Sequence, residues 1–432
     1  MNGKPFGNVM LVAATILSLV ACERSQSPPP VAQLSTGYWQ ANITLPGGQI
    51  DTGLEINRSG DTWRASLING QERVRIDEVT FADGTLLLRF PAFNNDIKAE
   101  LVDGRLLGEL TLVKRFGETQ VMPFEATPGA KRPESDPAGD AVIDVSGRWA
   151  VRFHEEGGGA TPSIGEFAQR GSRLFGTFLN PNGDHRFLAG YVQGNRFKLS
   201  TFDGAHAFIF SGEVVDDEIT NADFWSGTAW HQTWSAVRNA NVELPDAYAR
   251  TFLKLGYERL DFAFPNLDGE AVSIGDERFA GKVVVVMLGG SWCPNCNDEA
   301  RFMAPLYEEY REQGLEVVAL MYEHFDDHEL ATQQVRELRR KFGIQYVTLI
   351  AGISDKTVAA KTLPSLNAVL AFPTTIFIDR GGRVRSIHTG FSGPGTGEHH
   401  ERLQEEMTSL IDTLLAEPED LIDVLTSDDT SL

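Results

Sequence analysis

The chain has 432 residues, 42% of them hydrophobic and 23% charged, and its formal net charge at neutral pH is −22. This composition is typical of folded globular proteins, and the length predicts several domains rather than one. A charge of this size and sign repels phosphate groups, which argues against nucleic-acid binding and against docking to anionic lipids through basic patches. The three cysteines, Cys22, Cys293 and Cys296, are too few for a disulfide scaffold.

The N-terminal residues have the layout of a secretory signal. Lys4 precedes an apolar run at residues 9–20, which Ala21 and Cys22 follow. As a helix this run would span about 18 Å, less than the roughly 30 Å of a hydrocarbon core, so a permanent transmembrane anchor is disfavoured. Residues 19–22, Leu-Val-Ala-Cys, resemble a bacterial lipobox, which implies cleavage before Cys22 and acylation of its thiol. The alternative is an ordinary signal peptide with an incidental cysteine.

The residues after Cys22 predict how the folded part is attached. Glu23, not Asp, follows Cys22. By the same resemblance to lipoproteins, this favours the outer membrane over the inner membrane. Residues 28–30 are three prolines among polar residues. They predict an extended tether at residues 23–35.

The next part of the chain contains an internal repeat. Gly37-Tyr38-Trp39 recurs 110 residues later as Gly147-Arg148-Trp149. Further matches relate Gly60 to Gly171, residues 83–84 to 193–194 and residues 124–126 to 234–236, while residues 108–109 match residues 212–213 at a shorter offset. Within each copy, short alternating runs of apolar and polar residues, such as residues 38–45, 63–68, 86–90 and 208–211, are separated by Gly, Asn and Asp. This pattern predicts antiparallel sheet, as a sandwich or small barrel, in each copy.

From about residue 260 the pattern changes to apolar runs that alternate with amphipathic helices. Residues 283–288 form a continuous apolar run, which is typical of a strand buried on both faces. Neighbouring strands are predicted at residues 317–321, 347–350 and 374–378, helices at residues 331–342 and 403–414, and a hairpin turn at residues 379–382. The alternation predicts an α/β domain with parallel strands and crossover helices.

The fold class is therefore multidomain, with two antiparallel all-β modules followed by an α/β domain. The predicted segments are a lipoprotein signal peptide (1–22), a tether (23–35), β module 1 (36–127), a Pro-rich linker (128–144), β module 2 (145–240), a joint (241–259), the α/β domain (260–416) and an acidic tail (417–432).

The strongest chemical motif follows the predicted buried strand at residues 283–288. Cys293-Pro294-Asn295-Cys296 leads directly into a predicted helix, which places Cys293 at the N-cap and Pro294 at N1, where a missing N–H costs nothing. The free N–H groups of the first turn then stabilise a thiolate at Cys293, lowering the thiol pKa from about 8.5 by one to several units. Cys293 is the predicted nucleophile. Cys296, one turn inside the helix, is the predicted resolving thiol.

Other polar clusters predict no competing site. A structural zinc site needs four ligands, and the chain has no second cysteine pair to complete one with Cys293 and Cys296. His324 and His328 are interpreted as part of a solvated face at the start of a helix. The glycine-rich residues 393–397 lack the Gly-Lys-Ser/Thr ending of a phosphate-binding loop. No metal and no other cofactor is predicted.

At this point a family resemblance can be stated. Residues 292–296 (Trp-Cys-Pro-Asn-Cys), Glu299 and residues 372–379 (Phe-Pro-Thr-Thr-Ile-Phe-Ile-Asp) resemble the thioredoxin-like domain of TlpA/ResA-type thiol-disulfide oxidoreductases, over about residues 260–416. The resemblance implies that the bond before Pro373 is cis and that Pro373 lies against the active disulfide, where the neighbouring backbone pairs with the substrate chain. It also implies that Glu299 exchanges protons with the thiols, and it gives Trp292 and Pro294 supporting places at the site.

The sequence departs from the family pattern at two positions. Arg301 stands where the family has a helix-kinking proline, and Pro305 comes one turn later. Met287 stands where thioredoxins carry a buried Asp.

We expect an exported, lipid-anchored thiol-disulfide oxidoreductase that faces the periplasm. Its expected partners are envelope proteins with disulfides, a membrane redox donor and the membrane itself, through Cys22, but no nucleic acid. Two other functions stay open. A thiol peroxidase of peroxiredoxin type would carry a Pro and a Thr or Ser where this chain has Val286 and Gly290, and a copper-delivery module would use both thiols and a histidine such as His388. The role of the β modules is undecided at this point: they could bind the client, recruit a receptor or act as a spacer.

Overall fold

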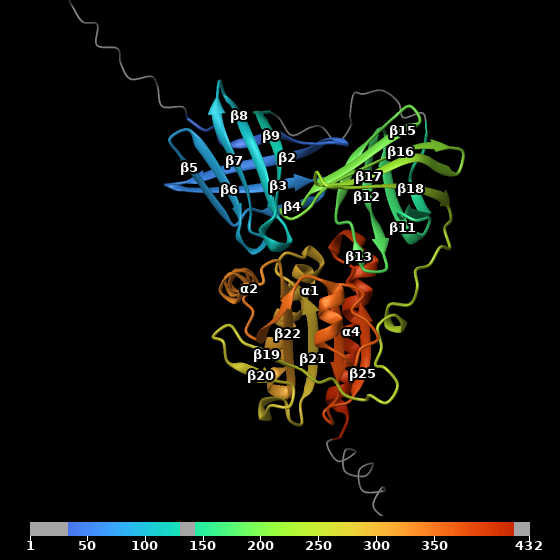
Figure 1. Cartoon of the computed structure of the whole chain (residues 1–432). Coiled ribbons are helices and arrows are strands. Elements are labelled where there is room, and N and C mark those ends of the chain that lie inside the picture. Colours follow the sequence, from blue (N-terminus) through green and yellow to red (C-terminus); the bar gives the residue numbers. More distant parts are fainter. Residues whose placement is uncertain (1–32, 130–142, 419–432) are drawn as a thin grey trace, which may run out of the picture.

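The computed structural model describes residues 33–129 and 143–418. Two β modules lie side by side over one face of a C-terminal α/β domain (Figure 1). The predicted signal peptide with Cys22, nearly all of the tether, residues 130–142 of the linker and the tail beyond residue 418 lie outside the described residues. A search of the described ranges finds no helix whose length and apolar character would suit it to crossing a membrane.

Module 1 is an open antiparallel sheet of nine strands in the order β4-β3-β2-β1-β9-β8-β7-β6-β5. Alternate residues of its strands are buried, as Trp39, Ala41 and Ile43 are in the first, because successive side chains of a strand point to opposite faces. The strands are β1 (Gly37–Leu45), β2 (Gly48–Ser59), β3 (Thr62–Asn69), β4 (Glu72–Arg75), β5 (Glu78–Ala82), β6 (Thr85–Phe90), β7 (Asn95–Val102), β8 (Arg105–Val113) and β9 (Thr119–Pro128), with short 3-10 turns η1 (Pro91–Phe93) and η2 (Arg115–Gly117).

Module 2 has the same succession of strands but closes into a barrel. Its sheet runs β11-β10-β18-β17-β16-β15-β14-β12-β13, and a further pairing of β11 with β12 joins the ends of the ring. The strands are β10 (Gly147–His154), β11 (Ala160–Arg170), β12 (Arg173–Asn180), β13 (Gly183–Asp184), β14 (Leu188–Gln193), β15 (Arg196–Phe202), β16 (Ala207–Val215), β17 (Glu218–Ser226) and β18 (Trp230–Arg238). The expected antiparallel architecture is thus present in both modules, and its barrel form is found in the second.

The two modules differ in one strand pairing. In module 2 the first half of β12 pairs with β14, and the two-residue β13 pairs with the end of β12. In module 1, β4 pairs with the second half of β3, and no ladder joins β3 to β5 among the described residues. Full closure removes the exposed edges of a sheet.

The strands of the two modules correspond one to one in chain order, from β1 and β10 to β9 and β18. Gly60 and Gly171 lie in equivalent turns with nearly the same positive φ, which glycine adopts at no steric cost. The predicted match between residues 108–109 and 212–213 is wrong. Gly108 lies in β8, whose counterpart is β17, whereas Gly212 lies in β16. A Gly-Glu pair in neighbouring strands produced a chance match.

The two modules share a hydrophobic core. Phe202, Ala205, Ala207 and Ile209 of module 2 are buried among the core residues of module 1, and Phe202 packs edge-to-face on Phe90 with ring centroids 5.7 Å apart. These side chains cover part of the buried face of the open sheet. Module 1 is therefore packed against the barrel rather than folded beside it as an isolated unit.

The C-terminal domain has a five-stranded mixed sheet in the order β23-β22-β21-β24-β25. β21 is parallel to β22, and β24 runs antiparallel to both β21 and β25. Its elements are β19 (Ala263–Pro265), β20 (Ala271–Ser273), β21 (Val283–Gly289), α1 (Pro294–Tyr310), β22 (Leu315–Glu323), α2 (His328–Phe342), β23 (Val347–Ile353), α3 (Lys356–Thr362), β24 (Thr374–Ile378), β25 (Val384–Thr389) and α4 (Glu398–Ala416). The sequence expectation of an α/β thioredoxin-like domain is confirmed.

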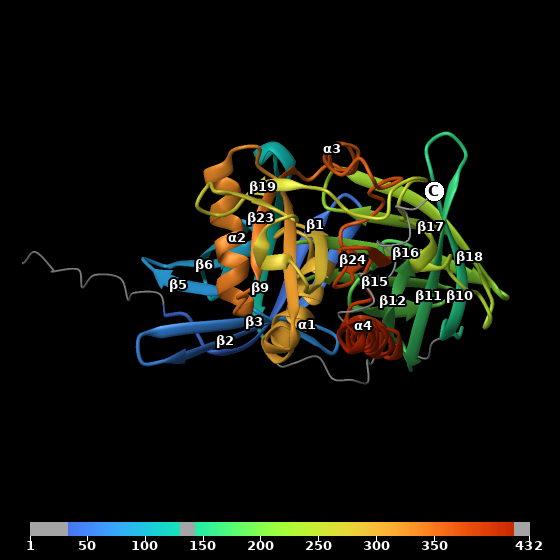
Figure 2. The same cartoon turned by 90° about the horizontal axis from the view of Figure 1, so that it is seen from below.

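Both faces of this sheet are covered. Helices α1, α2 and α4 pack on one face through residues such as Met303, Val335 and Met407. Helix α3 and residues of the segment 260–279 pack on the other face. Figure 2 shows the sheet and its helices in front of the two modules, so that the modules reach the end of the sheet at which α1 begins.

Candidate active site

The two cysteines lie where the central strand β21 gives way to helix α1. Cys293 is the N-cap residue of α1, with extended backbone angles (φ −99°, ψ 112°), and Pro294 occupies the first turn. The backbone N–H of Cys296 points at the Cys293 sulfur, 3.2 Å away. The two sulfurs are joined in a disulfide with the Cα atoms 5.2 Å apart. The sequence-predicted placement of the cysteine pair at a helix N-terminus is confirmed, and N–H groups at that end favour a thiolate after reduction.

The loop before β24 lies beside the Cys293 sulfur. The Phe372–Pro373 peptide bond is cis, as the family resemblance implied. The carbonyl oxygen of Phe372 lies 3.5 Å from the Cys293 sulfur. Phe372 and Trp292 are half-buried and pack edge-to-face with ring centroids 6.0 Å apart. The disulfide itself is recessed, since Cys293 and Cys296 each expose 5% of their surface.

Glu299 is completely buried one turn further along α1. The Thr375 hydroxyl donates a hydrogen bond to its carboxyl group, whose second oxygen has no hydrogen-bond partner within the described part of the chain. Burial raises the pKa of Glu299 to about 8, although the Thr375 hydrogen bond opposes the shift. Glu299 and Cys296 line the same small cavity, together with Tyr346. A largely protonated carboxyl group thus lies close to the predicted resolving thiol.

A second buried carboxyl group, missed by the sequence reasoning, holds the loop in front of Cys293. The Glu323 carboxylate, at the end of β22, accepts hydrogen bonds from the backbone N–H of Ser291 at 2.8 Å and from its hydroxyl at 2.7 Å. The Trp292 indole N–H donates to the Tyr322 carbonyl oxygen at 2.8 Å. Burial raises the pKa of Glu323 to about 7. No spacing in the sequence relates residue 291 to residue 323, because their proximity depends on the parallel pairing of β21 with β22.

The interpretation of His324 and His328 as a solvated face is wrong for His324. Its ring stacks on Trp292 with ring centroids 4.8 Å apart, and burial lowers its pKa to about 3. Its carbonyl oxygen accepts a hydrogen bond of 2.7 Å from the backbone N–H of Phe116 in module 1. His328 begins α2, where the carboxylate of Asp327 caps the helix. His324 therefore supports the active-site tryptophan and contacts a β module.

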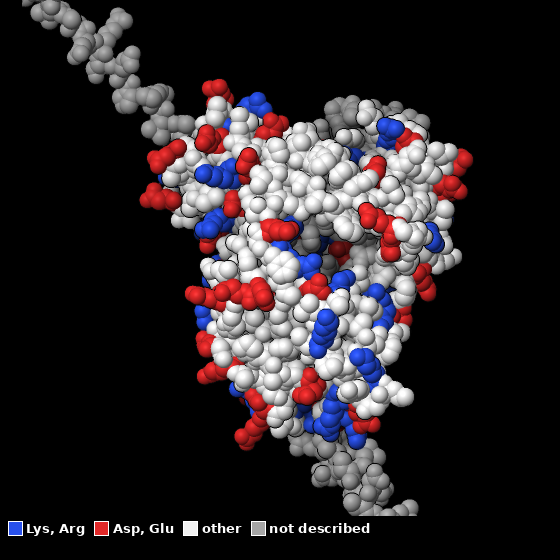
Figure 3. Space-filling view, in the orientation of Figure 1, with Lys and Arg blue, Asp and Glu red and all other residues white. Residues whose placement is uncertain are grey.

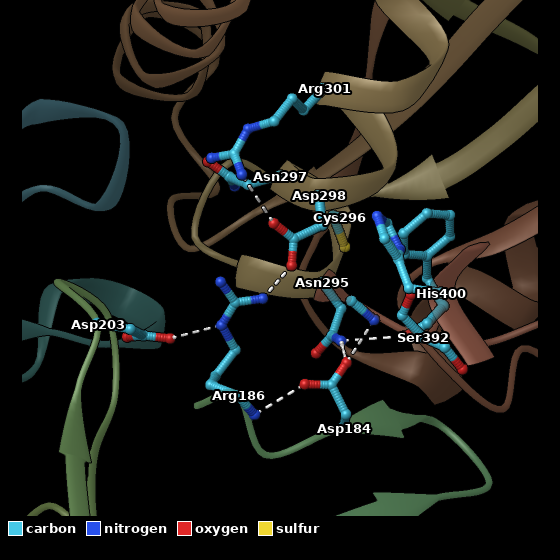
Figure 4. A network of polar contacts seen from close by, with 12 residues as sticks. Asp184, Arg186, Asp203, Asn295, Cys296, Asn297, Asp298, Arg301, Ser392 and His400 are labelled. Atoms are coloured by element: carbon cyan, nitrogen blue, oxygen red, sulfur yellow. Dashed lines mark hydrogen bonds and ion pairs between the residues drawn. The ribbon is translucent and has the colours of Figure 1, made fainter. Parts of the chain in front are cut away.

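Module 2 reaches the cysteine motif through the turn that contains β13. The Asp184 carboxylate accepts hydrogen bonds from the Asn295 side chain at 2.7 Å and from the backbone N–H of Gly393 at 2.6 Å (Figure 4). The Asn295 side chain also donates to the carbonyl oxygen of Phe391 at 3.0 Å. Asp184 is buried, which raises its pKa above the usual value. One residue of the cysteine motif is therefore bonded directly to a β module.

Arg186 makes the second link between module 2 and helix α1. Its guanidinium group pairs with Asp298 of α1, with Asp203 at 3.3 Å and with Glu72 of module 1 at 3.2 Å (Figure 4 shows the first two). The Arg186 side chain is 7% exposed and those of Asp203 and Asp298 are 2% exposed. Burial raises the pKa of Glu72 to about 7 even though Arg186 opposes the shift. One guanidinium group thus joins all three folded parts at the side of the active site.

The structure brings together Trp292, Cys293, Pro294, Cys296, Glu299 and Pro373, which the sequence analysis singled out. Cys22, the predicted lipidation site, lies outside the described residues. His388 lies in β25, where its ring nitrogen is 2.9 Å from the Gly390 carbonyl oxygen. Residues 33–129 and 143–418 contain no group of three or more His, Cys, Asp and Glu side chains arranged to hold a metal ion.

Comparisons with known proteins place the C-terminal domain among thiol-disulfide enzymes. A sequence profile of the AhpC/TSA family matches residues 255–387. The chain is 31% identical to thiol-disulfide oxidoreductase ResA of Halalkalibacterium halodurans over 146 residues, which are 33% of this chain and 72% of that protein. It is 31% identical over 135 residues to the thioredoxin-like protein YneN of Bacillus subtilis, a match covering 31% of this chain and 71% of that protein.

Solved structures were compared as well. A thiol-disulfide oxidoreductase from Bacteroides fragilis aligns over 36% of this chain and 99% of its own, with 19% identity and a TM-score of 0.27. Each of these matches covers well under half of this chain, and the profile match lies within its C-terminal part.

Proposed function

Because this chain belongs to the TlpA/ResA family of thioredoxin-like thiol-disulfide oxidoreductases, we propose that it is an exported, lipid-anchored enzyme that reduces disulfides of other envelope proteins. The observation that carries the proposal is the Cys293–Cys296 pair at the start of α1, beside cis Pro373. The proposed anchor is a lipid on Cys22 that holds the enzyme on the periplasmic side of the outer membrane. A membrane redox donor is the proposed source of electrons.

The geometry supports a two-step exchange. In the reduced enzyme, the Cys293 thiolate attacks one sulfur of the client disulfide, forms a mixed disulfide with it and releases the other client sulfur as a thiolate, which takes up a proton. In enzyme molecules in which Glu299 is ionised, Cys296 passes its proton to that carboxylate and attacks the Cys293 sulfur. The second client thiolate leaves and is protonated in turn. Two electrons pass to the client, and the enzyme is left with its Cys293–Cys296 disulfide.

Glu299 is suited to the proton exchange because its pKa of about 8 lies close to that of an ordinary thiol, about 8.5. Proton transfer between groups of similar pKa is reversible near neutral pH. The Thr375 hydrogen bond fixes the carboxyl group within the cavity that Cys296 also lines.

Insulin reduction tests the proposed roles of the two thiols. We expect Cys293→Ser to abolish the acceleration of insulin reduction by dithiothreitol that the enzyme provides, because the variant has no attacking thiolate at the helix N-terminus. We expect Cys296→Ser to accumulate mixed disulfides with client proteins, because the second step lacks its nucleophile. Non-reducing gel electrophoresis followed by mass spectrometry identifies the trapped proteins.

The third cysteine supplies the control for that experiment. Cys22→Ser should keep wild-type insulin reduction in solution, because it leaves both thiols of the motif in place. Full activity of the Cys293→Ser variant would show that electrons do not pass through Cys293. Trapped proteins without disulfides would contradict the proposed substrate class.

The two other functions considered for the cysteine pair gain no support. His388 lies beside the Gly390 carbonyl oxygen and joins no group of potential metal ligands among the described residues, so nothing favours copper delivery. The positions that a peroxidase of the peroxiredoxin type would fill with Pro and Thr are Val286, buried in β21, and Gly290.

A further inference from the structure

The turn at residues 180–186 of module 2, which we call the capping turn, lies against one side of the cysteine motif. Its Asp184 accepts the hydrogen bonds from Asn295, within the motif, and from Gly393, in the loop after β25. Figure 4 shows Asp184 and Arg186 facing Asn295 and Asp298 across the boundary between module 2 and α1. The capping turn therefore covers the surface formed by Asn295 and the loop of residues 390–393.

The fit between this turn and that surface leaves no space for another chain. A Cβ atom added to Gly390 would lie 2.8 Å from the backbone carbonyl carbon of Asn182, closer than real Cβ contacts. A Cβ atom added to Gly183 would lie 3.0 Å from the Asn295 side chain. Gly390 thus allows the two backbones to approach each other at the edge of the active site, and Gly183 leaves room for the Asn295 side chain.

Buried charges hold the capping turn in place. Arg186, at the end of the turn, pairs with Asp298 on α1, and both side chains are almost fully buried. At the other end, Arg250 binds the Pro181 carbonyl oxygen and lies 3.3 Å from the Asn182 side-chain oxygen. Charge-assisted hydrogen bonds are the stronger kind, and they lose more when one partner is removed than an exposed pair does.

Trp292 and Phe372 also lie beside the disulfide, and none of the hydrogen bonds and ring contacts described above joins the capping turn to them. Both side chains are half-buried, and the Phe372 carbonyl oxygen lies 3.5 Å from the Cys293 sulfur. Figure 3 shows that the boundary between the β modules and the C-terminal domain is hollowed on the face in view, with both Lys or Arg and Asp or Glu side chains around the hollow. The β modules thus stand over the active-site end of the domain.

We propose that the capping turn determines which clients reach Cys293. By closing the side formed by Asn295 and Gly393, it leaves the approach past Trp292 and Phe372. The client class that fits is a disulfide carried on a narrow, extended segment of an unfolded protein, whereas a disulfide on the surface of a folded domain collides with module 2. This specificity rests on the proposed reductase function, because it assigns the clients of the same cysteine pair.

The test compares two thiol reagents that share one reactive group. The reduced enzyme, in a Cys22→Ser background, is treated with N-ethylmaleimide and with a polyethylene-glycol maleimide, and the ratio of the two rates reports steric access to Cys293. Asp184→Ala removes the acceptor for Asn295 and Gly393, and Gly390→Ala places a methyl group against the backbone of Asn182. We expect each variant to raise the relative rate of the bulky reagent about tenfold, the change that corresponds to about 1.4 kcal/mol.

A matched control lies elsewhere in module 2. Asp217 forms an exposed ion pair with Arg238, away from the capping turn, and Asp217→Ala should leave the ratio unchanged. An unchanged ratio in a folded Asp184→Ala or Gly390→Ala protein overturns the proposal, and so does an equal rise in the control. Circular dichroism establishes that each variant is folded. Asp184→Ala removes a hydrogen-bond acceptor, whereas Gly390→Ala adds a methyl group. If one of these two proteins does not fold, the rate ratio of the other one tests the proposal.

The same proteins separate this proposal from the proposed function. Alkylation needs one accessible thiol and no turnover, so a wild-type enzyme that is alkylated yet does not reduce insulin would contradict the function and leave the access result intact. With turnover, the wild type should reduce a glutathionylated unstructured peptide faster than a folded protein of the same disulfide content. The opening variants should lose most of that preference. An equal preference in all proteins would contradict the assigned client class.

Discussion

At the scale of single residues, the site depends on a carboxyl group placed in an apolar setting. Glu299 lines a cavity with Met287, Ala300 and Tyr346, and the Thr375 hydroxyl donates a hydrogen bond to it. Among the described residues, no cationic side chain contributes to its pKa. Burial without a counter-charge penalises the ionised form. Since the pKa of Glu299 is raised to about 8 from 4.5, the folded enzyme holds a proton that the unfolded chain releases across that range.

This linkage predicts how Glu299→Gln changes stability with pH. Below about pH 4.5, both states of the wild type carry the proton, so the residue contributes no pH dependence. Between about pH 4.5 and about 8, the unfolded state binds fewer protons, so the wild type loses stability as the pH rises, by about 1.4 kcal/mol for each unit. We expect the amide to remove this loss, so that urea titrations find the variant relatively more stable at the alkaline end.

We expect Glu299→Gln to lower the activity of the enzyme, whereas it raises the stability relative to the wild type at alkaline pH. Removal of a proton-exchanging group typically costs about 10²-fold or more, so Glu299→Gln should reduce insulin slowly although it is the more stable protein above neutral pH. Glu405→Gln, an exposed position on α4, is the matched control for both measurements. If the difference between wild type and Glu299→Gln in unfolding free energy stays constant from acid to alkaline pH, Glu299 is ionised in the folded protein.

The functional residues that the sequence predicted are those fixed by local spacing. Cys293, Pro294 and Cys296 belong to one strand-to-helix connection, and that connection alone places them. Glu299 and Pro373 entered through a family resemblance. Asp184 and Arg186 could not be found in this way, because they reach Asn295 and Asp298 across more than a hundred residues of chain. No periodicity or motif encodes a contact between two separately folded parts.

At the scale of elements, local sequence patterns likewise predict the strands, whereas the pairing of strands that are distant in the sequence is not predicted. Alternation along each run predicted strands at residues 38–45, 63–68 and 86–90, which lie in β1, β3 and β6. The closure of one module and the openness of the other were not predictable, since they depend on whether β12 or its counterpart β3 pairs across to the next strand. Two copies with similar patterns therefore differ in architecture through one strand pairing, that of β12 with β14.

The loop between β21 and α1 provides a prediction at this scale. Ser291 donates two hydrogen bonds to the buried Glu323 carboxylate, and Asn297 donates to the carbonyl oxygens of both Ser291 and Cys293 at 2.9 Å. Ser291→Ala removes the hydroxyl donor and leaves a buried carboxylate oxygen without it, so we expect a loss of about 1–3 kcal/mol in unfolding free energy. Urea denaturation near neutral pH measures it.

The comparison for Ser291→Ala is a hydroxyl in a more open setting. Thr161 in module 2 donates to Glu155 at 2.6 Å in an exposed pair, where water replaces a lost hydrogen bond. Thr161→Ala should therefore change stability little. Equal losses in the two variants would mean that the Glu323 carboxylate is not desolvated, and that the loop in front of Cys293 is held by its other contacts.

At the scale of the whole molecule, the three folded parts are joined by contacts that an array of independent domains would lack. Module 2 contributes core residues to module 1, and Arg186 ties both modules to α1. Further pairs join module 1 to the C-terminal domain, Arg115 with Asp355 at 2.7 Å and Lys341 with Asp77 at 3.1 Å. Those pairs are partly exposed and contribute little each, so the buried cluster is the main electrostatic link.

Removal of the shared cation tests how strongly this link couples the parts. Arg186→Met keeps the length of the side chain but removes the cation shared by Glu72, Asp203 and Asp298, and breaking a buried ion pair by removing one partner costs about 3–5 kcal/mol. The cost requires ionised carboxylates. It should be largest near neutral pH and above, and shrink as the pH falls and the carboxyl groups take up protons, Glu72 first because burial raises its pKa to about 7. The control is Arg196→Met. It removes an ion pair with Glu213 in which the Arg196 side chain is 74% exposed, so it should cost at most about 1 kcal/mol at neutral or acid pH.

Urea titrations of both variants decide between two arrangements. A large, pH-dependent loss confined to Arg186→Met means that the modules and the active-site helix unfold as one coupled unit. Equal small losses mean that the modules dock on the enzyme domain without stabilising it.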